Sequence, residues 1–187
     1  MELNTYPLVC TRGVVLYPNQ EIVIDVGRDT SVHAVENAQD NYDKKICLFS
    51  QKELEKENPG KEDIYPVGTL CEVRHIRRFD NFLRVKFRGI KRVKLNNWIN
   101  GSLSDLAEVE ILESEKQDAV EEEALIRMIA DELDRMQGQD RFVTKEIVME
   151  ISKGMGGEFL SDKAVQGLPL DIERKQQYLE TLGVNDR

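Results

Sequence analysis

The alternation of apolar and charged residues is clearest between Leu83 and Arg88, where every second side chain is apolar. A period of two predicts a β-strand with one buried face. The preceding run Leu70–Phe79 is also strand-like, and Asp80-Asn81 suits a tight turn because both residues tolerate left-handed backbone. The two runs therefore predict a hairpin. Gly89 interrupts the alternation and Val93–Leu95 resumes it, so we expect a third strand to return along the second in a meander.

Strand-like patterns recur on both sides of this hairpin, in Tyr6–Tyr17, Glu21–Val26, Ile46–Phe49 and Ala107–Ile111. Between the second and third of these, Asp29, Thr30 or Ser31 can cap a short helix whose apolar positions fall within Val32–Ala38. The charged stretch Gln51–Asp63 contains a Pro-Gly pair and has no period, which predicts an exposed loop. About six strands with one helix can close, or nearly close, a small barrel.

At about Ser114 the spacing of apolar residues changes from two to nearly four, which indicates helices. We expect helices around Leu125–Met136, Thr144–Lys153 and Glu158–Val165, and a fourth capped by Asp171. The sequence therefore predicts an α+β protein with a β-domain at residues 1–113 and a helical subdomain at 114–187. Because few residues follow the last helix, we also expect a fragment of a longer protein.

The basic residues are concentrated in the predicted meander. Between Arg74 and Lys94 nine basic residues stand against one acidic residue, whereas the whole chain has a net charge of −9. An acidic chain argues against general nucleic-acid binding, which depends on phosphate neutralisation. For Arg84, Lys86 and Arg88, which point one way on the expected strand, two interpretations remain. They form either a solvated sheet face or a surface that binds anions or acidic proteins.

Catalytic and metal-binding patterns are weak. There is no phosphate-binding loop, since Pro59-Gly60-Lys61 lacks the first glycine and the hydroxyl, and neither histidine has an evident Ser or Cys nucleophile partner in sequence. Cys71 and His75 can face the same way on a strand, but no second ligand pair accompanies them. We expect the chain's three cysteines, Cys10, Cys47 and Cys71, to be small core residues in a reducing compartment.

No apolar run approaches the roughly 18 residues that a membrane helix needs, and the first residues lack the features of a secretory signal. We therefore expect a cytoplasmic protein that does not bind membranes, with no metal and no cofactor in this chain.

Several short motifs occur in an order that resembles the N-terminal domain of the Lon family of ATP-dependent proteases. They are Tyr6–Pro18, Val26–Arg28 with Ser31 and Ala34–Ala38, Gln51-Lys52, Asp63–Thr69, Val85–Arg92, and Leu168–Leu170 with Lys175-Gln176 and Leu179–Leu182. Each motif is weak alone, but the set covers nearly the whole chain. The sequence departs from the family pattern at Glu21–Val23, where a proline is usual, and at Phe79–Asn81, where Pro-Asp-Gly is common.

This resemblance implies a PUA-like β-domain followed by a helical bundle. It also implies that an ATPase using ATP and magnesium, and a serine–lysine endopeptidase, lie elsewhere along a longer, hexameric chain. The expected function is then a non-catalytic substrate-recognition and assembly module that holds unfolded or damaged proteins through weak, multiple contacts. Because aromatic side chains supply much of the energy of interfaces, we expect client contacts at Tyr65, Phe79, Phe82 and Trp98. For Trp98, burial at a strand end is the alternative.

Two other functions stay open at this stage. The basic meander can bind nucleic acid or polyphosphate, in which case affinity must fall steeply with salt. Alternatively, the chain is chiefly a structural oligomerisation domain.

Overall fold

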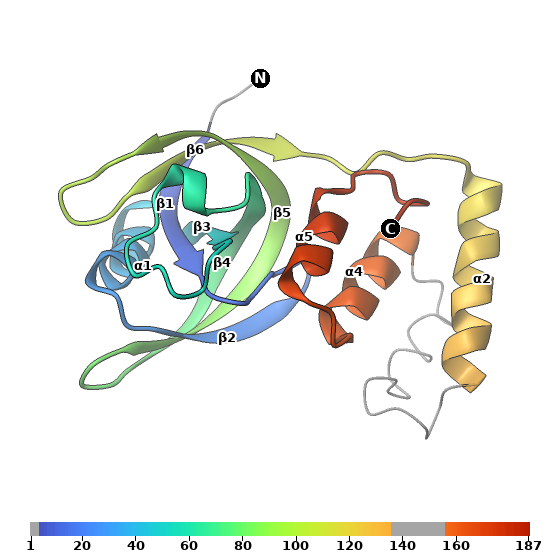
Figure 1. Ribbon diagram of the computed structural model, residues 1–187, viewed down its shortest axis with the longest axis horizontal. Coiled ribbons are helices and arrows are strands. Elements are labelled where there is room, and N and C mark those ends of the chain that lie inside the picture. Colours follow the sequence, from blue (N-terminus) through green and yellow to red (C-terminus); the bar gives the residue numbers. More distant parts are fainter. Residues whose placement is uncertain (1–3, 136–155) are drawn as a thin grey trace. The chain divides into compact units, whose positions relative to one another are not determined.

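The computed structural model describes residues 4–135 and 156–187, and the chain divides into two compact units, Met1–Glu113 and Ser114–Arg187. The first unit contains six strands, one α-helix and a short 3-10 helix (Figure 1). In chain order these are β1 (Asn4–Thr11), β2 (Glu21–Val26), α1 (Asp29–Asn41), β3 (Lys45–Ser50), η1 (Lys61–Asp63), β4 (Val67–Arg78), β5 (Leu83–Ile99) and β6 (Leu106–Leu112).

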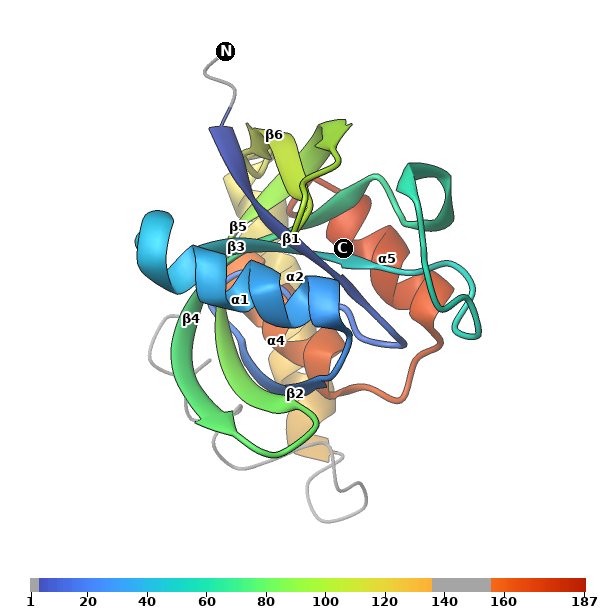
Figure 2. The same ribbon diagram turned by 90° about the vertical axis from the view of Figure 1, so that its left-hand side faces the viewer.

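The six strands form one sheet in the order β2-β5-β4-β3-β1-β6, and an additional pairing of β5 with β6 bends it into a partly closed barrel (Figure 2). All pairings are antiparallel except that of β1 with β3. The predicted six-stranded β-domain with one helix is therefore confirmed. The parallel pair was not predicted, because the sequence between β1 and β3 gives no sign of which strand will lie beside which.

The interior of this unit has two apolar clusters that share the central strands. On β3, Leu48 packs into the cluster covered by α1, while Cys47 packs into the cluster beneath β6. Val9 and Leu8 divide in the same way on β1. Strands buried on both faces read as continuous apolar runs, as these two do. Burial of one such aliphatic side chain stabilises the folded state by about 1.5–3 kcal/mol. The residues of β1 and β3, which are buried on both faces, therefore contribute strongly to the stability of the sheet.

Two strand predictions need correction. The first strand ends at Thr11 and not at Tyr17, because Gly13 takes a φ of +67° and redirects the chain. The expected third strand of the meander does not exist, since β5 runs unbroken through Gly89. A Cβ atom on Gly89 would lie 2.2 Å from the carbonyl oxygen of Tyr17. This glycine therefore permits a close approach of two backbone segments and does not make a turn.

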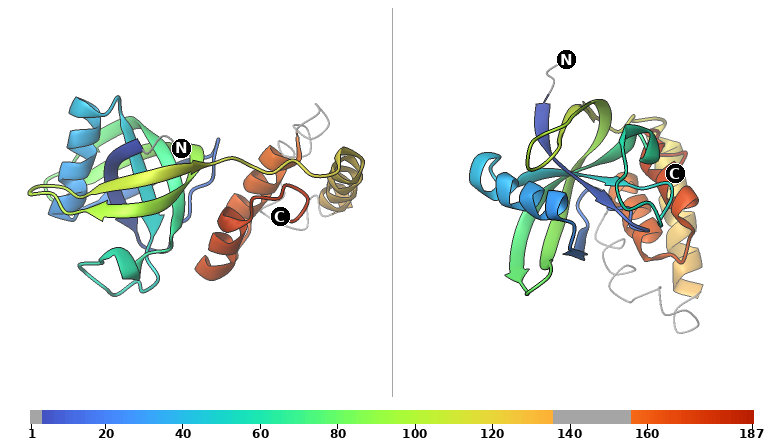
Figure 3. Two further views of the ribbon diagram at one scale, coloured as in Figure 1. Left: turned by 90° about the horizontal axis from the view of Figure 1, so that it is seen from above. Right: turned by 60° about the vertical axis from the view of Figure 1, so that its left-hand side comes forward.

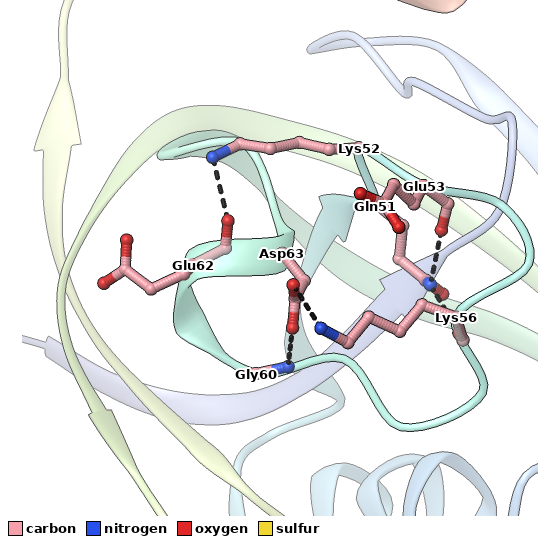
Figure 4. Close-up of polar contacts among 7 residues, drawn as sticks. All are labelled: Gln51, Lys52, Glu53, Lys56, Gly60, Glu62 and Asp63. Atoms are coloured by element: carbon pink, nitrogen blue, oxygen red, sulfur yellow. Dashed lines mark hydrogen bonds and ion pairs between the residues drawn. The ribbon is translucent and has the colours of Figure 1, made fainter.

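The helix cap was also predicted wrongly. The residue that precedes α1 is Arg28, and no side chain caps the helix there. The stretch Gln51–Asp63 is exposed for the most part, as predicted, but it is held by its own side chains (Figure 4). Asp63 accepts hydrogen bonds from Lys56 and from the backbone N–H of Gly60, while the buried Gln51 donates to the carbonyl oxygens of Glu53 and Lys56.

In the second unit the described helices are α2 (Ala119–Arg135), α4 (Gly157–Gly167) and α5 (Ile172–Glu180). Asp171 caps α5 as predicted, accepting a hydrogen bond of 2.8 Å from the backbone N–H of Arg174. The helix predicted at Thr144–Lys153 lies outside the described residues. Figure 3 shows these helices in two further orientations.

The last residues of the chain pack within this second unit. Glu115 and Gly183 form a parallel bridge, and the Arg187 guanidinium donates to the Ser114 hydroxyl at 2.8 Å. Arg187 also forms an ion pair of 3.5 Å with Asp162, and both side chains are almost wholly buried. The few residues that follow the last helix therefore contribute to the core of this unit.

Candidate functional site

The turn of the β4–β5 hairpin carries two stacked aromatic rings. The Phe79 and Phe82 ring centroids lie 4.7 Å apart with an interplanar angle of 12°, and the backbone N–H of Phe79 donates to the Phe82 carbonyl at 2.9 Å. Asp80 and Asn81 between them are exposed, as a turn requires. The phenyl rings are half-buried only. The turn between β4 and β5 projects from the rest of the sheet (Figures 1 and 2). The partly exposed rings therefore present apolar surface there.

Two arginines cover these rings. The Arg77 guanidinium lies 5.0 Å from the centroid of Phe79, and Arg84 lies 5.4 Å from Phe79 and 5.7 Å from Phe82. At these distances a guanidinium is attracted to the electron-rich ring face. We call Arg77, Phe79, Phe82 and Arg84 the hairpin cluster. It combines apolar, cationic and aromatic surface, the composition that is enriched where interfaces hold most of their binding energy.

A cavity of about 290 Å³ lies beside the hairpin cluster. One wall is the hairpin from Arg78 to Leu83, and the other is the segment that leads into α1, including Gly27, Asp29 and Val32. A Cβ atom on Gly27 would lie 3.7 Å from that of Phe82. An added Cβ atom would thus make only an ordinary van der Waals contact, and the hairpin and the start of α1 both line the cavity.

Arg84, Lys86 and Arg88 form a basic stripe on β5, and acidic residues of the neighbouring strand β2 lie beside it. Both carboxylate oxygens of Asp25 accept hydrogen bonds of 2.7 Å from Arg84, and Lys86 forms an ion pair of 2.6 Å with Glu21. These hydrogen bonds are the main reason that the pKa values of Asp25 and Glu21 lie below their ordinary values. Arg88, the third residue of the stripe, pairs in register with Glu21 on one side.

On its other side Arg88 pairs in register with Glu72 of β4. Glu21 and Glu72 form their ion pairs with Lys86 and Arg74, so two of the three basic residues of the stripe, Arg84 and Lys86, are paired with acidic residues. Asp25 and Arg77 were absent from the predicted site. No local pattern identifies Asp25 as the partner of Arg84, because 59 residues separate them.

The structure brings Phe79 and Phe82 together but does not add the other two predicted aromatics to them. Trp98 lies near the far end of β5, opposite Ala107 of β6, where it is half-buried against the apolar cluster beneath that strand. Tyr65 is half-buried just before β4, and its backbone N–H donates to Ser50. The hairpin cluster is thus the one place in the described residues where two of the predicted contact residues stack.

The three cysteines are thiols within the fold. Cys47 and Cys71 are buried, and burial raises the pKa of both. Burial also raises the pKa of Cys10 to about 12. Bulges between β4 and β5 leave Cys71 inside and His75 exposed, so these two side chains do not share a face. Within residues 4–135 and 156–187, no three His, Cys, Asp or Glu side chains gather closely enough to hold a metal ion.

The Gly-Lys pair in the loop does not form a phosphate cradle. The backbone N–H of Gly60 is bonded to the Asp63 carboxylate at 2.8 Å (Figure 4). The Lys61 ammonium donates to the Asn96 carbonyl at 3.0 Å. A carboxylate in this position would repel a phosphate. In the part of the chain that is described, no helix combines the length and apolar character needed to cross a bilayer.

Comparison with known proteins identifies relatives along the whole chain. Residues 5–187 match the family described as the ATP-dependent protease La (LON) substrate-binding domain. The chain is 30% identical over 187 residues to a Lon protease of Buchnera aphidicola from Acyrthosiphon pisum, covering 100% of this chain and 24% of the relative. It is 33% identical over 190 residues to a Lon protease of Syntrophomonas wolfei, covering 100% and 23%. The chain thus spans about a quarter of the length of these curated relatives.

Solved structures agree with this fold. The N-terminal domain of a Mycobacterium avium complex Lon protease superposes with a TM-score of 0.77 at 18% identity, covering 98% of this chain and 93% of that one. A Lon N-terminal domain protein from Xanthomonas campestris gives a TM-score of 0.66 at 15% identity, covering 97% and 92%.

Proposed function

The chain belongs to the family of Lon protease substrate-binding domains, and from this membership we propose that it is a non-catalytic module that binds unfolded or damaged polypeptides for degradation by a longer protein. Each contact with a client is weak and sequence-tolerant. Several such contacts raise the local concentration of the client beside the other domains. This mode of binding suits protein quality control, in which many different sequences must be accepted.

The hairpin cluster is the observation that carries this proposal. Phe79 and Phe82 stack at a projecting turn, two guanidiniums lie over their rings, and both rings line the adjacent cavity. Aromatic and arginine side chains at the centre of an interface typically dominate its binding energy. The rings are also held in place before binding, which lowers the entropic cost of association.

The remaining activities belong to the longer protein in this proposal. An ATPase with bound ATP and magnesium unfolds the client, and a serine–lysine peptidase cleaves it. The longer protein assembles as a cytoplasmic hexamer. Within it, this domain binds clients and forms contacts between chains. The loop at Gly60 does not suit a nucleotide, because its N–H is already bonded to Asp63.

Protein binding is better supported than nucleic-acid or polyphosphate binding. Arg84 and Lys86, which supply much of the basic stripe, already pair with Asp25 and Glu21. A phosphate backbone would have to compete with these carboxylates. Affinity for a client held through the hairpin cluster should therefore change little with salt, whereas phosphate binding would fall steeply.

Removing both rings tests the proposal. We expect the Phe79→Ala/Phe82→Ala variant to bind a permanently unfolded test protein at least tenfold more weakly than the wild-type chain, because truncation of an interface anchor typically costs 2 kcal/mol or more. Fluorescence anisotropy with a labelled test protein measures this affinity, and repeating it across a salt series separates client binding from phosphate-like binding.

The matched control is Leu103→Ala. Leu103 is 64% exposed in the connection between β5 and β6, so its truncation also removes exposed apolar surface but away from the hairpin. Unchanged affinity in this control and an unchanged melting temperature in the double variant complete the test. Equal affinities of the wild type and the double variant would exclude the hairpin cluster as the binding surface.

A further inference from the structure

The barrel of the first unit is open along part of one side. Residues Leu83–Arg88 of β5 pair with β2, and residues Arg92–Ile99 pair with β6. Because β4 occupies the other edge of β5 from Leu83 to Lys94, β2 and β6 must follow one another along the same edge. Strand β1 pairs with β6 only through Asn4–Pro7. Beyond Leu8, whose N–H donates to the Asp105 carbonyl just before β6, β1 lies across from β2 without a pairing between them.

We call this opening the seam. Its two sides are residues Val9–Arg12, from β1 and the turn after it, and residues Ile24–Arg28, from β2 to the start of α1. Within the described residues, Val9–Thr11 pair with β3 on one side and with no strand on the other, whereas the Leu8 N–H still donates to the Asp105 carbonyl at 3.1 Å. Strand β2 is the end strand of the sheet. Two unpaired strand edges therefore border one opening, and such edges readily accept a further strand.

The seam contains a cavity of about 310 Å³. A residue in a sheet occupies a slot about 3.3 Å long, about 4.8 Å wide and about 10 Å deep, or about 160 Å³. The cavity therefore matches about two extended residues and is too small for a helix.

One end of the seam is positively charged. The Arg12 guanidinium donates to the Lys56 carbonyl at 3.5 Å, and Arg28 donates to the side-chain oxygen of Gln51. Gln51 is wholly buried and is itself held by the loop that follows it (Figure 4). A guanidinium carries five N–H donors, so each arginine has donors beyond those that these bonds use.

No carboxylate neutralises these two arginines in the described residues. Neither forms an ion pair there, and Asp25, which also lines the cavity, is bonded through both oxygens to Arg84. Burial and then the nearby charge of Arg12 lower the pKa of Arg28, so the two guanidiniums are close enough to repel each other. A ligand carboxylate placed between them would relieve that repulsion and accept charge-assisted hydrogen bonds.

We propose that the seam binds an extended segment of a client polypeptide as an added β-strand, with a carboxylate of the client held by Arg12 and Arg28. This inference rests on the proposed function, since it names how one client segment is bound. Backbone pairing along the strand edges accepts many sequences, whereas the arginines favour acidic ones. Gly27 lines both the seam and the cavity beside the hairpin cluster, so a single client can extend from one to the other.

The test uses the 187-residue chain and a short labelled peptide rich in Val and Thr, with a central Glu, an acetylated N-terminus and an amidated C-terminus. We expect Arg12→Ala and Arg12→Ala/Arg28→Ala to weaken its binding at least tenfold. Replacing the Glu of the peptide by Gln should weaken binding to the wild type similarly, but should change nothing further in the double variant. N-methylation of alternate peptide amides should abolish binding, because it removes the backbone donors.

A second peptide with no acidic side chain but a free C-terminal carboxylate distinguishes the two sources of that group. Tighter binding of this peptide than of the Glu peptide assigns the arginines to chain ends, and the reverse assigns them to acidic side chains. Arg74→Ala is the matched control, since Arg74 is exposed and paired with Glu72 outside the seam. Arg12 is itself exposed, so its truncation should leave the fold intact even if Arg28→Ala does not.

Three results would overturn the proposal. They are equal affinity for the Glu and Gln peptides, undiminished binding of the N-methylated peptide, and arginine-dependent binding of inorganic polyphosphate without binding of any peptide. Loss of peptide binding in Phe79→Ala/Phe82→Ala but not in the arginine variants would reject the seam while leaving the proposed function standing. If the wild type binds neither peptide nor unfolded protein, the proposed function itself fails.

Discussion

At the scale of single residues, charge pairing between neighbouring strands determines what the basic face can bind. Arg84 and Lys86 form ion pairs with acidic residues of β2, whereas Arg12 and Arg28 form no ion pair among the described residues. Exposed ion pairs add little to stability. The pairs on β5 matter instead because they leave Arg84 and Lys86 less able to bind an anionic ligand. Arg84 and Lys86, in the densest basic run of the sequence, are thus less available to a ligand than Arg12 and Arg28.

Asp25 provides a direct test of this pairing. Its hydrogen bonds to Arg84 hold its pKa below the ordinary 3.8, so its contribution to stability is present at neutral pH and is lost as pH falls through the lower folded-state value. In Arg84→Ala the pKa of Asp25 should rise toward 3.8. Titration of the carboxyl carbon by NMR measures it. Arg77→Ala serves as control, and an Asp25 pKa unaffected by the loss of Arg84 would contradict the pairing.

At the scale of elements, the alternation of apolar and polar residues predicted where most strands lie in the sequence. It did not predict which strands pair with each other in the sheet. Strands such as Glu21–Val26 follow directly from the period, because burial of one face imposes it. The parallel pairing of β1 with β3, and hence the seam, depends on contacts between distant segments that no local pattern encodes. The same limit explains why Phe79 and Phe82, which flank one turn, could be predicted as neighbours while Arg12 and Arg28 could not.

Gly89 shows how a local signal can be misread at this scale. We expect Gly89→Ala to destabilise the β-domain by about 3 kcal/mol, near the upper end for overpacking, because the new Cβ would lie 2.2 Å from a backbone oxygen of Tyr17. Denaturant unfolding followed by tryptophan fluorescence measures the change. Gly60→Ala is the control, since its Cβ would meet nothing closer than 3.7 Å. Similar stability of the two variants would show that the loop at Tyr17 moves aside without cost.

At the scale of the whole molecule, the two units have different types of core. The β-domain is held by two aliphatic clusters, while the described part of the helical unit includes the buried Asp162–Arg187 pair. Removing one partner of a buried pair leaves an uncompensated charge, which typically costs about 3–5 kcal/mol. The helical unit should therefore be sensitive to a single isosteric change.

We expect Asp162→Asn to destabilise the helical unit by about 3 kcal/mol and to leave the β-domain unaffected, because Asp162 lies wholly within the second unit. Hydrogen exchange in α4 and α5, compared with that in β3, resolves the two units. Glu132→Gln, which breaks the exposed pair with Arg135, should have almost no effect. Equal effects of these two substitutions would show that the buried pair contributes nothing.

The most direct test of the central claim, that this domain binds unfolded polypeptide through the hairpin end of its β-domain, is hydrogen exchange of the 187-residue chain with and without a permanently unfolded test protein. We predict slower exchange in the hairpin around Phe79–Leu83 and in the neighbouring segment Ile24–Arg28. Protection confined to residues 114–187, or no protection at all at saturating test protein, would contradict the account.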